Sequence, residues 1–234
     1  MRYREHPPPA SHEGLIKACW TLDGSGAAGT WLPQQATPDG CVELIRRLAG
    51  RSRWDGEQPE CFAVGLVGTP TGFEISGDAR FAAVRLWPWA WPLLSPLPLA
   101  SLAGRWIAFA HPVLDALLDF DAALRLLPVP PALAATGRAL LGAGSVEAMG
   151  TATGMNPRTL QRWFARHVGL PPRAYLRLLR FQKAFEQVPG AESLADHAAA
   201  QGFADQAHMA REFRELAGVP AREAKRTAKG PFLP

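Results

Sequence analysis

The chain has 234 residues, of which 47% are hydrophobic and 20% are charged, a balance typical of a globular protein with one large or two small domains. No stretch approaches the roughly 20 apolar residues that cross a bilayer, and the first residues lack an apolar signal segment, so we expect neither a membrane-spanning nor a secreted protein. Cys19, Cys41 and Cys61 are too few and too widely spaced for a disulfide framework or a close-spaced zinc motif. A protein of the cytoplasm is expected.

The positive charge is concentrated in the last part of the chain. Residues 1–144 contain 12 Lys and Arg against 13 Asp and Glu, whereas residues 145–234 contain 13 against 8. The second segment therefore holds a net charge of +5 and accounts for the whole basic excess. A basic segment beside a nearly neutral one favours a polyanionic partner.

The first half reads as short strands separated by turns that are rich in Gly, Pro and Asp. This pattern predicts an all-β domain, either an antiparallel barrel or a sandwich. The expected strands are residues 17–22, 30–34, 41–48, 61–68, 73–76 and 81–87.

The pattern changes after Pro88. Residues 89–94 predict a short helical turn and residues 111–120 a helix, and three prolines between residues 128 and 131 then interrupt the chain. That interruption is the expected domain junction. We therefore predict a two-domain α+β protein, with a β-rich domain over residues 1–128, a connecting segment over 129–144, a helical domain over 145–226 and a tail over 227–234.

The helical part contains one motif twice. Its apolar residues recur with a period near 3.6, and residues 145–155 match residues 193–203 before a second matching stretch with one inserted residue. Each copy is a short helix, a turn with a glycine and a second helix, the layout of a helix-turn-helix. The repeat aligns Gly154 with Gly202 and Arg162 with Arg211.

The second helix of the first copy has a polar face suited to reading DNA. Asn156 is its expected N-cap, followed by Pro157. Arg158, Gln161 and Arg162 lie on the face opposite the apolar one, and Arg and Gln form bidentate hydrogen bonds to guanine and adenine edges in the major groove. The alternative is an ordinary solvated helix with residues chosen for helix propensity.

The second copy offers fewer hydrogen-bonding side chains. Asp205 is its expected N-cap. Its base-reading candidates are Gln206, Ala207, Ala210 and Arg211, in which the alanines can only touch thymine methyl groups. We therefore expect the two copies to read DNA unequally.

A long helix over residues 171–188 links the two copies. Arg173, Arg177 and Arg180 form a basic stripe along it, which suits contacts with DNA phosphates or, equally, salt bridges within the protein. The phosphate-contact candidates of the whole domain are Arg166, Arg173, Arg177 and Arg214.

The stretches GMNPRTLQRWFARHVGLPPRAYLRLLRFQKA and SLADHAAAQGFADQAHMAREFRELAGVP, within residues 145–226, resemble the DNA-binding domain of AraC/XylS-type transcription regulators. The resemblance implies two helix-turn-helix units held apart by a linking helix, each placing its second helix in a major groove of double-stranded DNA. It also implies a transcription regulator, for which we expect a homodimer and a contact with RNA polymerase. The first half holds only His6, His12 and His111, without the spacing of a metal site, and it has no nucleophile motif, so we expect no enzymatic activity, metal or cofactor. The sequence departs from the family pattern at His197, Gln201 and Ala224.

The first half, with its motif PDGCVELI, resembles a β-rich domain that precedes AraC-type modules. This resemblance implies a role in sensing or in oligomerisation. A pocket for an apolar or aromatic effector is one hypothesis; a surface that only binds protein partners is another, and an enzyme fused to a DNA-binding module is a third. Trp side chains are ordinary core material as well as pocket walls. The effector-binding candidates are Trp20, Trp31, Trp87, Trp89 and Trp91.

Overall fold

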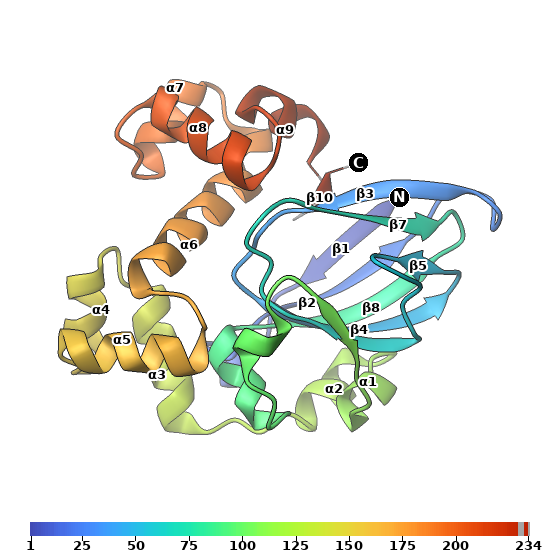
Figure 1. Cartoon of the computed structure of the whole chain (residues 1–234), viewed down its shortest axis with the longest axis horizontal. Helices are drawn as coiled ribbons and strands as arrows, with labels where there is room; N and C mark the ends of the chain where they lie inside the picture. The colour runs from blue at the N-terminus through green and yellow to red at the C-terminus, as the bar shows by residue number, and fades with distance from the viewer. Residues whose placement is uncertain (229–231, 234) are drawn as a thin grey trace.

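A computed structural model describes residues 1–228 and 232–233. Figure 1 shows a β-rich part that holds the N-terminus and a helical part that follows it in the chain. All six expected strands form, although the strand that begins at Cys61 ends at Val64. The strands are β1 (Arg2–His6), β2 (Ile16–Asp23), β3 (Trp31–Ala36), β4 (Val42–Ala49), β5 (Ser52–Arg53), β6 (Cys61–Val64), β7 (Thr71–Ser76), β8 (Arg80–Leu86), β9 (Trp106–Ala108) and β10 (Phe232–Leu233).

The strands form two antiparallel sheets that pack against each other. One has the order β1-β2-β8-β4-β6-β9 and the other the order β10-β3-β7-β5. Side chains of both sheets meet in one apolar cluster, which includes Trp20 and Ile45 from the first sheet and Ile75 and Phe232 from the second. The arrangement is a sandwich with two separate sheets, so the sandwich alternative is confirmed and the closed barrel is wrong.

Short helices follow the last long strand of the sandwich. The turn expected after Trp87 forms as η2 (Pro88–Leu93). The single helix expected over residues 111–120 is wrong, because α1 ends after one turn and Asp119 caps a separate helix α2. The other elements of this region are η3 (Leu99–Leu102), α1 (Pro112–Asp115), α2 (Phe120–Arg125) and α3 (Pro131–Leu141), and a further short helix, η1 (Ala10–His12), lies between β1 and β2.

The C-terminal part is helical, as expected. α4 and α5 lie at one end of the long helix α6, and α7, α8 and α9 lie at its other end (Figure 1). The elements are α4 (Val146–Thr153), α5 (Pro157–His167), α6 (Pro172–Gln187), η4 (Val188–Gly190), α7 (Leu194–Ala200), α8 (Gln206–Leu216) and α9 (Ala221–Thr227). No helix in the described ranges is both long enough and apolar enough to span a membrane.

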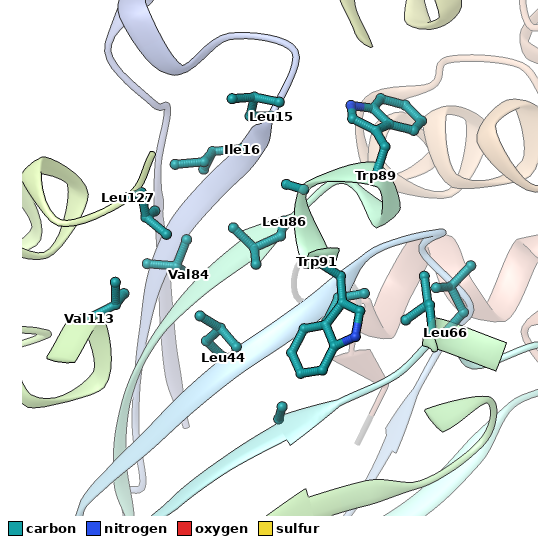
Figure 2. Packing of buried hydrophobic residues seen from close by; sticks show 14 of the residues in the cluster. Leu15, Ile16, Leu44, Leu66, Val84, Leu86, Trp89, Trp91, Val113 and Leu127 are labelled. Carbon is teal, nitrogen blue, oxygen red and sulfur yellow. The ribbon is translucent and has the colours of Figure 1, made fainter. Parts of the chain in front are cut away.

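The first helix-turn-helix unit shares a core with the sandwich. Figure 2 shows part of this cluster, in which Trp89 and Trp91 lie among aliphatic side chains of the sheet. The Trp89 ring lies 5.8 Å from that of Trp163 on α5 and 6.1 Å from that of Tyr175 on α6. The second unit has a cluster of its own, centred on Phe181, Phe213 and their neighbours. The domain boundaries stay a prediction. One hydrophobic cluster contains residues from both sides of the expected junction at residues 129–144.

Candidate nucleic-acid interface and ligand cavity

The two helix-turn-helix units use the same local devices. Ser145 and Ser193 cap the first helices, since their hydroxyl oxygens accept hydrogen bonds from backbone amides of the first turn. Each first helix is followed by a glycine in the left-handed region, Gly154 with φ 69° and Gly202 with φ 73°. These positions agree with the repeat found in the sequence and explain why glycine occurs in both copies.

The second helices begin at the two expected N-caps. The Asn156 Oδ1 atom accepts a hydrogen bond of 2.9 Å from the amide of Thr159. The Asp205 Oδ1 atom accepts one of 2.6 Å from the amide of His208. Each cap fixes where its helix starts, and so fixes which side chains α5 and α8 present to solvent.

The α5 helix presents an exposed cationic face. Leu160 and Phe164 are buried, and Trp163 is half-buried. The candidates for base and phosphate contacts lie exposed on the other side, and none forms an ion pair with a residue in the described ranges. They are Arg158, Gln161, Arg162 and Arg166.

The α8 helix presents a smaller polar face. Met209 and Phe213 are buried. Its candidates are exposed except for Ala210, which is half-buried, and its arginines have no ion pair within residues 1–228 and 232–233. These candidates are Gln206, Ala207, Ala210, Arg211 and Arg214.

The arginines of α6 differ in role: some form salt bridges within the protein, and one is free to contact DNA phosphates. Arg177 forms ion pairs with Glu212, at 2.7 Å, and with Glu215, both on α8. The hydrogen bonds with these carboxylates raise the pKa of Arg177, although desolvation opposes the shift. Arg180 lies 3.7 Å from Glu212. The stripe is therefore largely an internal salt-bridge network, and only Arg173 is exposed without such a partner in the described part of the chain.

A cavity lies between the two sheets of the sandwich. Its volume is about 90 Å³, and its walls are mostly apolar side chains from both sheets. Trp20, which the sequence singled out, lines it, and so does Trp54, which the sequence did not single out. The acidic side chains of Asp39 and Glu43 also face it.

The other four tryptophans proposed for an effector pocket lie elsewhere. Trp31 packs against the guanidinium groups of Arg51 and Arg53 at the surface. Trp89 and Trp91 are completely buried and donate hydrogen bonds to the carbonyl oxygens of Gly14 and Leu97, and Trp87 stacks on Trp89. These four rings do not line the cavity between the sheets, because three of them belong to the junction core and the fourth lies at the surface, and an effector role for them stays a prediction.

A buried arginine organises the polar side of the cavity. Arg85 has no exposed side-chain surface, and its guanidinium lies 2.8 Å from Glu43, 2.9 Å from Asp39 and 3.1 Å from Glu5. Although desolvation opposes it, the surrounding carboxylates raise the pKa of Arg85 well above its ordinary value, so it stays charged. The Trp20 indole donates a hydrogen bond of 2.6 Å to the other oxygen of Glu43.

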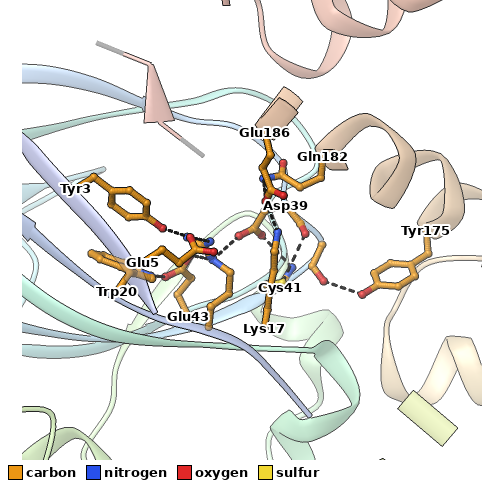
Figure 3. Close-up of polar contacts among 12 residues, drawn as sticks. Tyr3, Glu5, Lys17, Trp20, Asp39, Cys41, Glu43, Tyr175, Gln182 and Glu186 are labelled. Atoms are coloured by element: carbon orange, nitrogen blue, oxygen red, sulfur yellow. Dashed lines mark hydrogen bonds and ion pairs between the residues drawn. The ribbon is translucent and has the colours of Figure 1, made fainter. Parts of the chain in front are cut away.

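The same cluster continues into the DNA-binding half (Figure 3). The amide of Cys41 donates to Asp39, and the carbonyl oxygen of Gly40 accepts a hydrogen bond from Tyr175 on α6. Lys17 forms an ion pair of 2.7 Å with Glu186, also on α6. The cavity wall and the linking helix are thus connected by the hydrogen bond from Tyr175 to Gly40 and by the ion pair between Lys17 and Glu186.

Two features of the sequence indicate this buried ion-pair cluster. Asp39, Cys41 and Glu43 all lie in the stretch PDGCVELI, and Arg85 is a lone charge inside an otherwise apolar strand. A charge in a buried strand requires a partner, because an isolated ion is costly to desolvate. Which carboxylates provide it depends on strand pairing: Glu43 lies opposite Arg85 in the β4–β8 ladder.

Two families match the chain. Residues 149–227 match a family described as a helix-turn-helix domain, and residues 4–108 match a domain of unknown function (DUF6597). No curated protein matches the sequence. Within the described ranges, no three His, Cys, Asp or Glu side chains come together as metal ligands.

Among solved structures, the chain is similar to ToxT from Vibrio cholerae. An apo structure of ToxT is 8% identical, with a TM-score of 0.49 over 89% of this chain and 96% of that one. ToxT bound to (E)-4-(8-methylnaphthalen-1-yl)but-3-enoic acid is 7% identical, with a TM-score of 0.47 over 96% and 98%. ToxT bound to an unsaturated fatty acid is 8% identical, with a TM-score of 0.46 over 94% and 95%.

Proposed function

We propose that this chain, a DNA-binding transcription regulator of the AraC/XylS type, inserts α5 and α8 into neighbouring major grooves and responds to a small molecule bound between its two sheets. The match of residues 149–227 to a helix-turn-helix domain family supports this class. One observation carries the proposal for the DNA interface. The arginines exposed on the second helix of each unit have no ion pair within the described residues, whereas Arg177 and Arg180 between the units are paired with carboxylates.

The first unit is the main reader of bases in this proposal. Arg158, Gln161 and Arg162 lie exposed on one face of a capped helix, and a B-DNA major groove about 12 Å wide admits a helix. Arg suits the N7 and O6 acceptors of guanine, and Gln suits adenine. The second unit contributes one strong base contact, from Arg211, because its other central positions are alanines or lie at the start of α8.

The length of α6 suits two successive grooves. Its 16 residues span roughly 24 Å at about 1.5 Å per residue. α5 packs against Tyr175 in the first turn of α6 and α8 packs against Phe181 and Phe185 in its second half, and successive major grooves on one DNA face lie about 34 Å apart.

Phosphate contacts position the domain on the duplex. Arg166, Arg173 and Arg214 are the proposed contacts, since each is exposed without an ion pair to a described residue. Arg177 is a weaker candidate than the sequence predicted, because binding a phosphate would compete with Glu212 and Glu215.

The N-terminal sandwich is proposed to sense a small molecule. The cavity between its sheets has apolar walls and a few convergent polar groups, the composition typical of a ligand site. Its polar wall is one residue from Gly40, which accepts the hydrogen bond of Tyr175 on the linking helix. A ligand that moves this wall would thus reach α6 through a direct contact. A sandwich that only binds protein partners is the second candidate, supported by the exposed side chains of Leu118 and Leu126 near α2.

The cellular compartment and the protein partners are proposed from the same class of protein. We propose that the regulator works in the cytoplasm, where its three free cysteines stay reduced. A homodimer and a contact with RNA polymerase stay predictions, and no residue is assigned to either.

The DNA proposal is tested with the whole chain and duplex DNA selected from a random pool. Fluorescence anisotropy at rising salt should show a steep loss of affinity, because binding releases counterions from the phosphates. A base-by-base substitution scan of the selected site should place most of the sequence preference in the segment bound by α5. The matched control is Arg125→Ala, which removes an exposed arginine of α2 and should leave affinity unchanged. No salt dependence, or equal preference in both segments, would contradict the proposal.

A further inference from the structure

The cavity in the sandwich is partly filled by a residue that comes after the DNA-binding helices in the chain. Strand β10 pairs with β3, with Phe232 opposite Ala36 and Leu233 opposite Gln35. Phe232 lines the cavity and is 7% exposed. Its ring lies 5.5 Å from that of Tyr3, and 5.9 Å from those of Trp20 and Phe73. The sandwich therefore already holds an aromatic ring in an aromatic cage.

The size of the cavity shows what this ring prevents. The space beside Phe232 is about 90 Å³. A cavity of roughly 150 Å³ is needed to hold benzene, and drug-sized ligands occupy sites of about 300–1,000 Å³. A molecule with an aromatic ring therefore fits this site only if the ring of Phe232 leaves it.

The polar groups of the cavity restrict the charge of such a molecule. Asp39 and Glu43 line it, while no Lys, Arg or His lines it among the residues that the structure describes. Arg85 lies behind this wall and is shared among Asp39, Glu43 and Glu5, so three carboxylates surround one guanidinium and the cluster keeps a net negative charge. A carboxylate ligand would therefore lie against acidic side chains, with no cation exposed to it on the described wall. Ser52 also lines the cavity, is 1% exposed, and its hydroxyl oxygen has no hydrogen-bond partner in the described structure. A buried hydroxyl without a partner is costly, so it offers a hydrogen bond to an occupant.

We propose that the ligand of this cavity is an aromatic molecule with a neutral or cationic polar group, and that it binds by replacing the ring of Phe232. This inference rests on the proposed sensing function and specifies its ligand class. Phe232 is one of the two residues of β10, so we expect its displacement from the cage to unpair β10 from β3. Ligand binding then releases β10, the strand that follows α9 in the chain, while Gln35 of β3 still donates a hydrogen bond to the carbonyl oxygen of Ala217 in the second unit.

Three probes with the same ring test the ligand class: 2-phenylethanol, 2-phenylethylamine and phenylacetate. Isothermal titration is performed on the whole chain and on Phe232→Ala. The neutral and cationic probes should bind the variant about tenfold or more tightly than the wild type, because no internal ring competes with them. Phe120→Ala is the control, since it removes a partly buried ring that lies outside the cavity and should leave binding unchanged.

A second measurement uses the unmodified protein and so does not depend on the variant folding. Gln35 and Ala36 are adjacent on β3, which lies between β10 and β7, so one of their two amides faces β10 and the other faces β7. Saturating 2-phenylethanol or 2-phenylethylamine should speed hydrogen exchange at the amide that faces β10 and leave the one that faces β7 unchanged. Equal affinities of wild type and Phe232→Ala, no binding of either probe to the variant, or unchanged exchange at the amide that faces β10 would overturn the replacement of Phe232. Phenylacetate binding as tightly as 2-phenylethylamine would overturn the charge class.

The failure of the sensing function gives a different result. If the probes bind and release β10 but leave the affinity of the chain for its selected DNA unchanged, the site inferred here stands and its role in regulation does not. If a probe changes DNA affinity while exchange at Gln35 and Ala36 is unaltered, the sensing function stands and the release of β10 is wrong.

Discussion

The hydroxyl of Tyr175 donates a hydrogen bond of 3.0 Å to the carbonyl oxygen of Gly40. Tyr175 is on the linking helix α6, and Gly40 lies between Asp39 and Cys41, which line the cavity of the sandwich. A Cβ atom at Gly40 would lie 3.1 Å from the Tyr175 ring, and its φ of 70° is a left-handed value that side chains rarely adopt. Gly40 thus allows the cavity wall and α6 to meet.

Replacing Tyr175 with Phe should lower the free energy of unfolding by about 1–3 kcal/mol, because the Gly40 carbonyl loses its partner while the ring still fills its site. Urea unfolding of the variant measures this loss. Tyr3→Phe is the matched control: the chain has two tyrosines, and the hydroxyl of Tyr3 bonds to Glu5 at a more exposed position. A loss from Tyr3→Phe as large as that from Tyr175→Phe would show that the junction has no special role.

Gly137→Ala should destabilise the protein by about 1–3 kcal/mol through overpacking. A Cβ at this position of α3 would lie 2.0 Å from the carbonyl oxygen of Gly14 and 2.6 Å from the Trp89 indole nitrogen. Gly144→Ala is the control, since nothing lies within 4 Å of the added carbon. Thermal unfolding of both variants distinguishes them, and an unchanged midpoint for Gly137→Ala would contradict the packing of α3 on the sandwich.

Acid should weaken the ion pair between Lys17 and Glu186. Burial raises the pKa of Glu186, but the charge of Lys17 and the hydrogen bonds from Lys17 and Gln182 outweigh it, so its pKa in the folded state is below the ordinary value. The pair therefore contributes stability above the unfolded pKa of about 4.3, and loses it as the pH falls below that value. Glu186 is 38% exposed at its side chain, so the contribution is under about 1 kcal/mol.

The test of this pH dependence is the difference in unfolding free energy between wild type and Glu186→Gln. This difference should shrink as the pH is lowered from 7 to below about 4, because the wild-type carboxyl then also becomes neutral. Lys17→Met should give the same trend from the other partner. A difference that stays constant over this range would mean that the pair does not contribute.

Arg162→Ala should weaken binding to the selected DNA by about 1–3 kcal/mol and relax base preference at one position of the site. Arg211→Ala should have a similar cost in the other segment. Anisotropy with matched and substituted duplexes measures both effects. Arg177→Ala provides the contrast, because it removes the ion pairs with Glu212 and Glu215 and should lower stability more than it changes the salt dependence of DNA binding. Loss of affinity without any change in base preference would assign Arg162 to phosphate contact.

The parts of this protein that depend on local chemistry could be predicted from the amino-acid sequence. The repeated Ser, Gly and Asn or Asp positions act within one turn of their own helices, so the two helix-turn-helix units and the exposed face of Arg158, Gln161 and Arg162 could be predicted from spacing alone. The six main strands could be predicted for the same reason, since turn residues separate them.

Features that depend on residues far apart in the chain could be seen only once the chain was folded. The free or paired state of Arg177 depends on Glu212 and Glu215, about 35 positions away. The cavity required two sheets to pack, and its occupant Phe232 is brought there by pairing with a strand near the other end of the sequence. The strand β10 has only two residues and no alternation, so only the partner strand β3 defines it. The tryptophans show the same dependence on packing. Composition identifies them as large apolar groups, but only the packed structure places Trp20 at the cavity and Trp89 in the junction core. The reason is that burial depends on neighbours that the local sequence does not specify.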